Sequence, residues 1–210
     1  MVLTVAPVPA NLAVACWNQS FPYGANYQCT VNVSSNAGSA LGSINWSLDG
    51  AAPTIASLSG GNAQFTVPLP VVGTHKVVID YPQQTNYGAG APRTFTFSVT
   101  PAPVIVALTP SSWYAKVGTS FTFKTAIASW SAGAPNATGN VQFHDGQKLL
   151  ATVPVNASGI AQFTTSNLSA ASHTISAVYS GGTNYDTGSG TVVHRGRVVM
   201  WHRHSCLCGT

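Results

Sequence analysis

The stretch VYSGGTNY (178–185) decides the fold, because the first half of the chain contains a second version of it, IDYPQQTNY (79–87). In both copies a tyrosine ends an apolar run and is followed, after a short turn sequence, by Thr-Asn-Tyr. Asn tolerates the left-handed backbone conformation that tight turns need, and the second Tyr can pack its ring over the end of a domain. The motif is therefore expected to shape the turn between two strands, once in each of two repeats.

The repeat extends well beyond this motif and keeps nearly the same spacing throughout. The matching segments, first copy against second, are INWSLDG (44–50) and VQFHDG (141–146), AQFT (63–66) and AQFT (161–164), and His75 and His173. One deletion brings the earliest pair of segments into line. Because the matches occur in the same order in both halves, the sequence predicts two copies of one structural unit.

Short segments within each unit alternate apolar and polar residues and are bounded by Gly, Pro, Asn and Ser, as half-buried strands are. These segments are 27–33, 75–81, 93–99, 121–127 and 173–179. The Asp-Gly pairs at 49–50 and 145–146 predict hairpin turns, because Gly accepts the positive φ that such turns need. This spacing of strands is typical of a two-sheet sandwich. We expect an all-β fold of two tandem β-sandwich domains.

Composition excludes several classes of function. Hydrophobic residues make up 45% of the chain, enough for real cores, whereas only 6% of residues are charged. The net charge is +4, but three of the eight cations lie near the end of the chain, and no basic stripe alternates with aromatic residues. Nucleic-acid binding is therefore not expected. No apolar run approaches the roughly 20 residues that span a bilayer, so membrane insertion is not expected either.

The order of these features resembles that of the bacterial Ig-like repeat domains, which occur in tandem in large surface and secreted proteins. The shared features are the strand that ends in Asp-Gly, the AQFT segment, the His-led strand that ends in Tyr, and the TNY turn. The resemblance covers about residues 2–193 and is better in the second unit. It implies immunoglobulin-like sandwiches that serve as spacers, stalks or adhesin segments, although a sandwich can host many unrelated functions.

The domain boundaries expected from the repeat are 1–101 and 102–193, with a short linker around Pro101 to Pro103 that limits hinge freedom. Residues 194–210 depart from the repeat and are expected to form an irregular tail, disordered or non-native. We therefore expect a fragment of a longer repeat protein, with its export signal outside the printed sequence.

Cys16 and Cys29 fall at the end of the first strand and inside the second strand of unit one. Neighbouring strands can bring such Cβ atoms within reach of a disulfide, which we favour over two free thiols. A disulfide would imply an oxidising compartment.

The tail contains the one cluster of metal-ligand type, His202, His204, Cys206 and Cys208. In an extended chain these side chains point to one face, and four such ligands would suit tetrahedral zinc. A single straight strand cannot wrap a tetrahedron, however, so adventitious metal affinity is the favoured interpretation and no cofactor is expected.

Candidate catalytic residues are few. His144 beside Asp145 is the best acid/base pair and Asp80 a further carboxylate, but neighbours on a strand point to opposite faces. The sequence lacks a G-x-S-x-G elbow. His75 and His173 occupy the same repeat position, which indicates a structural role for both. A glycosidase-type hydrolase therefore remains only an alternative.

Exposed aromatic residues are the candidate ligand-binding residues. Trp130 and Tyr185 are expected at one end of the second sandwich, with Trp113 and Tyr114 at the opposite end. Either pair could form a platform that stacks on a sugar ring. Burial at a domain junction is the competing interpretation.

The sequence thus predicts a non-catalytic extracellular or cell-surface module for structure or adhesion, with neighbouring Ig-like repeats as partners. The first alternative is an accessory module that binds a polysaccharide or a cell-surface glycan. The second is the hydrolase.

Overall fold

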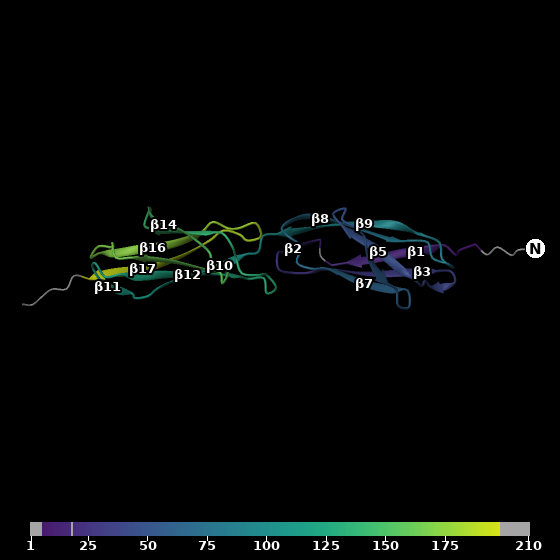
Figure 1. Cartoon of the computed structure of the whole chain (residues 1–210), viewed down its shortest axis with the longest axis horizontal. Helices are drawn as coiled ribbons and strands as arrows, with labels where there is room; N and C mark the ends of the chain where they lie inside the picture. Colours follow the sequence, from purple (N-terminus) through teal and green to yellow (C-terminus); the bar gives the residue numbers. More distant parts are fainter. Residues whose placement is uncertain (1–5, 18, 198–210) are drawn as a thin grey trace, which may run out of the picture. The chain divides into compact units, whose positions relative to one another are not determined.

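The computed structural model describes residues 6–17 and 19–197. These residues form two compact units, one built mainly from the chain up to Ala102 and the other mainly from Pro103 onward (Figure 1). Every regular element in the described ranges is a β-strand, as the alternating sequence pattern predicts. None of these residues belongs to a helix long and apolar enough to cross a membrane.

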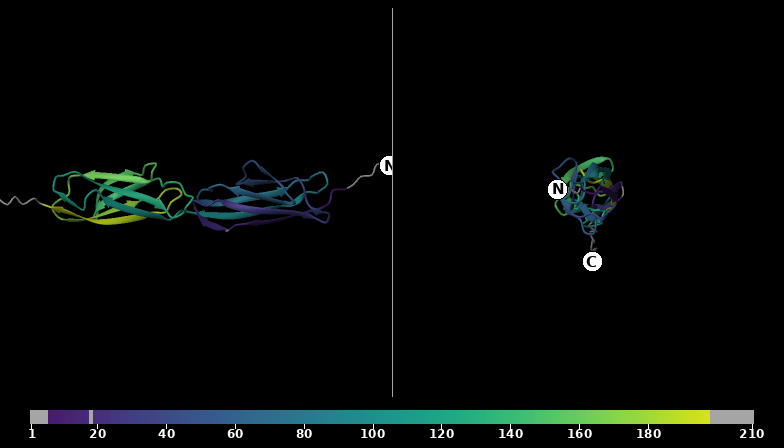
Figure 2. Two further views of the ribbon diagram at one scale, coloured as in Figure 1. Left: turned by 90° about the horizontal axis from the view of Figure 1, so that it is seen from below. Right: turned by 90° about the vertical axis from the view of Figure 1, so that its right-hand side faces the viewer.

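The first unit is a sandwich of two sheets. Its strands are β1 (Ala10–Cys16), β2 (Ser20–Pro22), β3 (Tyr27–Ser35), β4 (Gly38–Ser39), β5 (Ser43–Leu48), β6 (Thr54–Ser57), β7 (Asn62–Val67), β8 (Gly73–Tyr81) and β9 (Gly90–Thr100). One sheet has the order β1-β3-β4, with β7 also paired to β3, and the other has the order β2-β9-β8-β5-β6. Figure 2 shows this layered arrangement from two further directions.

The second unit repeats this topology. Its strands are β10 (Val104–Pro110), β11 (Tyr114–Lys116), β12 (Phe121–Ser129), β13 (Asn140–Asp145), β14 (Lys148–Pro154), β15 (Ile160–Thr165), β16 (Ser172–Tyr179) and β17 (Gly188–Arg197). One sheet has the order β10-β12-β15 and the other β11-β17-β16-β13-β14. Since two sheets with crossovers between them recur in both units, the predicted tandem immunoglobulin-like sandwiches are confirmed.

The core of each unit follows from the period-two pattern of its strands. On β8, His75, Val77, Ile79 and Tyr81 are buried, whereas the residues between them are more exposed. The hydroxyl of Tyr81 donates to the Leu41 carbonyl at 2.6 Å. The equivalent Tyr179 in the second unit donates to the Thr138 carbonyl. Each buried tyrosine thus ties the end of a central strand to the loop that precedes the neighbouring strand.

The two predicted Asp-Gly turns are present. Asp49 and Gly50 both have positive φ, 51° and 78°, between β5 and β6. In the second unit Asp145 pairs with Lys148, so that Gly146, at φ 57°, opens a two-residue turn. The left-handed conformation at these positions explains why the sequence places Gly there.

The predicted disulfide joins two adjacent strands of the first unit. Cys16 on β1 lies directly opposite Cys29 on β3, and the two sulfur atoms are bonded. The second unit has Pro110 and Phe123 at the same register position and has no such link there. One unit therefore carries a covalent cross-link that its repeat lacks.

The predicted start of the tail at residue 194 is wrong. The last strand, β17, continues to Arg197, and His194 is fully buried, with its ring stacked on Phe121 at a centroid distance of 4.4 Å. The backbone pairing of His194 with His173 continues the β16–β17 ladder. The sequence HRGR (194–197) is typical of a polar tail, because a histidine followed by two arginines breaks the apolar alternation that marks a strand.

Candidate functional site

The second unit brings together a carboxylate, an imidazole and a hydroxyl. Asp145 is the last residue of β13, and His173 lies near the start of β16, the antiparallel neighbour of β13. Ser169 lies in the loop that connects β15 to β16. Residues far apart in the sequence thus meet where two neighbouring central strands, β13 and β16, respectively end and begin.

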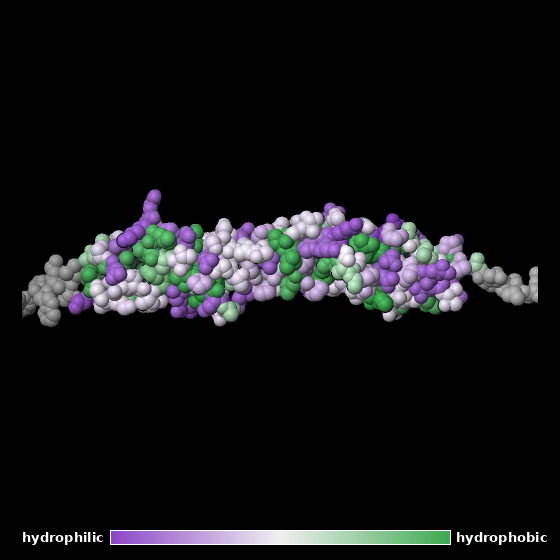
Figure 3. All heavy atoms as spheres, turned by 45° about the horizontal axis from the view of Figure 1, so that its top comes forward, coloured by the Kyte–Doolittle hydropathy of each residue, from purple (hydrophilic) through white to green (hydrophobic). Residues whose placement is uncertain are grey.

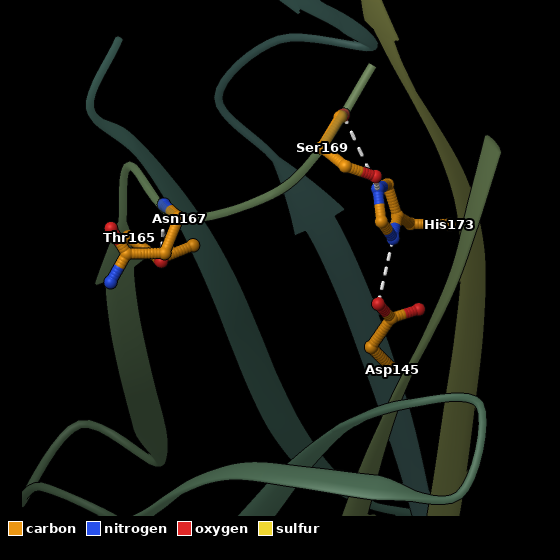
Figure 4. Close-up of polar contacts among 5 residues, drawn as sticks. All are labelled: Asp145, Thr165, Asn167, Ser169 and His173. Atoms are coloured by element: carbon orange, nitrogen blue, oxygen red, sulfur yellow. Dashed lines mark hydrogen bonds and ion pairs between the residues drawn. The ribbon is translucent and has the colours of Figure 1, made fainter. Parts of the chain in front are cut away.

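The three side chains form a continuous line of hydrogen bonds (Figure 4). His173 Nδ1 lies 2.7 Å from Asp145 Oδ2, and His173 Nε2 lies 3.1 Å from Ser169 Oγ. The Ser169 carbonyl oxygen lies 3.3 Å from the same Nε2. When Nδ1–H donates to the carboxylate, Nε2 keeps a lone pair that can accept the serine proton. The geometry is that of a nucleophile, a general base and an orienting acid.

Close packing fixes the position of Ser169. A side chain at Gly196 on β17 would meet the Ser169 carbonyl oxygen at 2.0 Å, closer than any real contact. The Gly196 N–H also donates to the Ala171 carbonyl at 2.9 Å. The loop therefore lies directly on a glycine of β17, in a part of the chain that sequence analysis assigned to the tail.

The three residues line a cavity of about 640 Å³. The other lining residues are Ser120, Lys148, Leu149, Leu150, Phe163, Thr164, Thr165, Ser166, Asn167 and Leu168. The side chains of His173 and Asp145 are 12% and 24% exposed, so the pair is partly shielded from solvent yet reachable from the cavity. The Asn167 N–H donates to Thr165 Oγ1 at 3.1 Å, apart from the line of three residues (Figure 4).

The first unit contains the same pair in a different setting. His75 Nδ1 lies 2.8 Å from Asp49 Oδ2, and His75 Nε2 lies 2.8 Å from the Val71 carbonyl oxygen. Val71 occupies the position of Ser169, so a backbone carbonyl is the partner of Nε2 here. The predicted structural role of both histidines agrees with these contacts, because each one ties a loop to a hairpin.

Both groups of the first pair have shifted pKa values. Burial alone would lower the pKa of His75, but hydrogen bonds to Asp49 and to the Val71 carbonyl, with the charge of Asp49, outweigh burial and raise it. Burial alone would raise the pKa of Asp49, but the hydrogen bonds from His75 and from the Lys76 N–H and the charge of His75 lower it. Both shifts favour the charged pair.

The structure gives the predicted acid/base residues other partners. Asp145 bonds to His173 and not to its chain neighbour His144, which is absent from the cavity lining. Asp80 accepts a hydrogen bond from Asn45 at 3.4 Å in the first unit. The pair that does form, Asp145 with His173, has no local sequence signal, because 28 residues separate the two.

Three of the four predicted aromatic residues face solvent. Trp130 is 71% exposed in the loop after β12, and Trp113 and Tyr114 are exposed beside Arg195. Tyr185, in contrast, is 6% exposed and offers no open ring face to a ligand. Burial follows from its place in the turn, where its backbone exchanges hydrogen bonds with Gly182.

The predicted metal ligands His202, His204, Cys206 and Cys208 lie outside the described residues. Within residues 6–17 and 19–197, no group of three or more His, Cys, Asp and Glu side chains could hold a metal ion.

Comparison with known families matches residues 107–194 to the bacterial Ig-like domain (group 3). This match confirms the resemblance for the second unit. No curated protein matches the chain.

Several solved structures are similar to this chain. The fibronectin(III)-like modules of Clostridium thermocellum CbhA share 12% identity with a TM-score of 0.40, over 91% of this chain and 99% of that one. Domains A168-A170 from titin share 14% identity with a TM-score of 0.49, over 92% of this chain and 66% of that one. The Yersinia pseudotuberculosis adhesin InvE shares 13% identity with a TM-score of 0.40, over 88% of this chain and 58% of that one.

Proposed function

We propose that the two units are spacer modules of an extracellular or cell-surface repeat protein, and that they resist stretching. The observation that carries this proposal is the parallel pairing of an early strand with the last strand in each unit. In the first unit β2 pairs with β9, and in the second β11 pairs with β17. The chain therefore enters each unit near one end of its last strand and leaves it at the other end.

This pairing loads hydrogen bonds in shear when the two ends of a unit are pulled apart. In the first unit the Ser98 N–H donates to the Gln19 carbonyl and the Tyr23 N–H donates to the Thr100 carbonyl, both at 2.8 Å. In the second unit the Arg195 N–H donates to the Trp113 carbonyl at 3.1 Å. Because β2 and β9 run in the same direction, tension on the two ends slides one strand along the other and strains these bonds together.

One further feature supports an extracellular location. The Cys16–Cys29 disulfide is of the kind that persists in oxidising compartments. On the face drawn in Figure 3, apolar side chains lie in small groups among polar ones, so this face is suited to contact with water.

Single-molecule force spectroscopy on the full chain, held by its two ends, tests this function. We expect two resolved unfolding events, one for each unit. Ser98→Pro removes the N–H that bonds to Gln19 and should lower the unfolding force of the first unit, whereas Ser98→Ala keeps the N–H and should leave that force unchanged. The proposal fails when neither unit gives a resolved force peak, or when both variants behave alike.

The cavity around Trp113 supports a second candidate function, glycan binding. Trp113, Tyr114, Val193 and Arg195 line a cavity of about 400 Å³. An aromatic face suits stacking on a sugar ring, and the guanidinium suits an acidic substituent. Depletion of the wild-type protein by an insoluble acidic polysaccharide, and loss of depletion in Trp113→Ala but not in Trp130→Ala, would favour this function over the spacer alone.

A further inference from the structure

We propose that Ser169 is a nucleophile, that His173 is its general base and Asp145 the orienting carboxylate, and that the adjoining cavity accepts carboxylic esters with a short apolar acyl chain. This activity goes beyond the spacer function and does not depend on it.

The distances place each group in its role. A general base must lie within about 2.6–3.2 Å of the atom that gives up its proton. His173 Nε2 meets this condition for Ser169 Oγ at 3.1 Å, and Asp145 holds the opposite ring nitrogen at 2.7 Å. The carboxylate thus fixes the tautomer in which Nε2 carries the lone pair.

Comparison of the two units shows that this arrangement is specific to the second. In the first unit Nε2 of His75 lies 2.8 Å from a backbone carbonyl, which can only accept, so the nitrogen acts as a donor. In the second unit the corresponding carbonyl lies 3.3 Å from Nε2, and the serine hydroxyl is the nearer group at 3.1 Å. The exchange of Val71 for Ser169 turns a structural clamp into a pair of groups between which a proton can move.

The surroundings of Ser169 select the class of substrate. The cavity of about 640 Å³ is within the range for small-molecule sites. Leu149, Leu150, Phe163 and Leu168 give it apolar walls, which would receive an acyl chain. The hydroxyl groups and amide of the 164–167 segment lie along the same cavity and leave room for a polar leaving group.

The reaction is an acyl transfer that balances with water. Ser169 Oγ forms a bond to the ester carbonyl carbon while its proton passes to His173 Nε2. The carbon–oxygen bond to the leaving group then breaks, and the departing alkoxide takes the proton from Nε2. Water attacks the acylated serine, gives its proton to Nε2, and releases the carboxylic acid as the proton returns to Oγ.

A fluorophosphonate probe tests the nucleophile directly on the full-length protein, with mass-spectrometric mapping of the labelled peptide. We expect one equivalent of label at Ser169 and hydrolysis of p-nitrophenyl butyrate above the rate of the denatured protein. Ser169→Ala should lose both. Ser172→Ala removes an exposed hydroxyl on β16 that lies outside the cavity lining and should keep both, which makes it the matched control.

A second variant tests the base. Positioned general bases contribute about 10²–10⁴-fold, so Asp145→Asn, which leaves the imidazole poorly oriented, should slow labelling at least about 10-fold. Circular dichroism checks that this variant is folded. If Asp145→Asn does not fold, the result for Ser169→Ala alone tests the proposal. Wild-type protein that labels no faster than denatured protein, or label that persists in Ser169→Ala, overturns the proposal. Either result leaves the force measurements on the spacer function intact.

Discussion

His75 holds two hydrogen-bond acceptors at once: Nδ1 lies 2.8 Å from Asp49 Oδ2, and Nε2 lies 2.8 Å from the Val71 carbonyl oxygen. A neutral imidazole has one N–H and can satisfy only one of them, whereas the imidazolium satisfies both. The geometry of the first unit therefore favours the protonated imidazole of His75, and the raised pKa of His75 agrees with this geometry.

The stability of the first unit should depend on pH through this pair. Because the pKa of His75 is raised on folding, its contribution is complete below about pH 6.5 and is lost as pH rises through the folded-state value. Because the pKa of Asp49 is lowered, its contribution is present above about pH 3.9 and is lost as pH falls through the folded-state value. The pair should stabilise the unit most between these limits.

Denaturant unfolding of the wild type and of His75→Gln across pH 4–9 measures this effect. We expect the difference in free energy of unfolding to be largest near pH 5 and to shrink on the alkaline side. A difference that stays constant over this range would mean that His75 acts by packing alone.

The Cys16–Cys29 disulfide should stabilise only the unit that contains it. It closes a loop with a sequence separation of 13 residues, and loops of this size are stabilised by roughly 3 kcal/mol when cross-linked. Reduction should therefore lower the free energy of unfolding of the first unit by about this amount and leave the second unit unchanged. The double variant Cys16→Ala with Cys29→Ala should no longer respond to the reductant.

Force spectroscopy gives an independent measure of the same cross-link. The residues between the two cysteines cannot extend while the disulfide is intact. Reduction should lengthen the unfolded first unit by about 40 Å, because 13 residue steps of ~3.5 Å each replace the 4.1 Å that separates the two Cα atoms in the cross-link. Equal contour lengths with and without reductant would show that the disulfide is absent from the protein in solution.

The buried tyrosine hydroxyls should contribute similarly in both units. Tyr81→Phe leaves the Leu41 carbonyl without its donor, and Tyr179→Phe does the same to the Thr138 carbonyl. An unpaired buried acceptor costs about 1–3 kcal/mol, which chemical denaturation would detect. Tyr87 provides the control, since its hydroxyl bonds to the Ser39 carbonyl at 3.3 Å in an exposed setting. Equal losses from Tyr81→Phe and Tyr87→Phe would contradict this explanation.

The fold can be predicted well from the sequence because the same local pattern of strands and turns occurs in both repeats. The alternation in HKVVIDY (75–81) and HTISAVY (173–179) places tyrosine and aliphatic side chains on one face, and the structure buries them. The disulfide could also be predicted, because Cys16 and Cys29 lie on strands that neighbour each other in the sheet. These features depend on period and turn chemistry, which are local properties of the chain.

The site could not be predicted in the same way, because register between strands decides it. Sequence analysis paired Asp145 with its chain neighbour His144, but the antiparallel pairing of β13 and β16 places Asp145 beside His173. Ser169 joins them only because its loop packs closely on Gly196. The polar end of β17 could not be predicted for a related reason: His194 is a polar residue, so nothing in the sequence indicates that it is buried.

His194 should make the second unit sensitive to acid. Its ring is fully buried, its Nδ1 lies 3.1 Å from the Ser112 carbonyl oxygen, and its Nε2 has no partner among the described residues. Burial lowers the pKa of His194; the hydrogen bond to the Ser112 carbonyl opposes this shift without overcoming it, and electrostatic interaction with the nearby His173 lowers the pKa further. The folded unit therefore contains the neutral ring.

The sign of the pH effect follows from this lowered pKa. The stabilisation is complete above about pH 6.5 and is lost as pH falls through the folded-state value, opposite to the His75 contribution in the first unit. His194→Phe keeps a ring against Phe121 but cannot titrate. We expect this variant to be less stable at pH 7.5, because Ser112 loses its donor, and to lose less stability than the wild type on acidification to pH 4.5. Parallel pH profiles of the two proteins, measured by thermal unfolding, would assign the acid sensitivity of the second unit to another group.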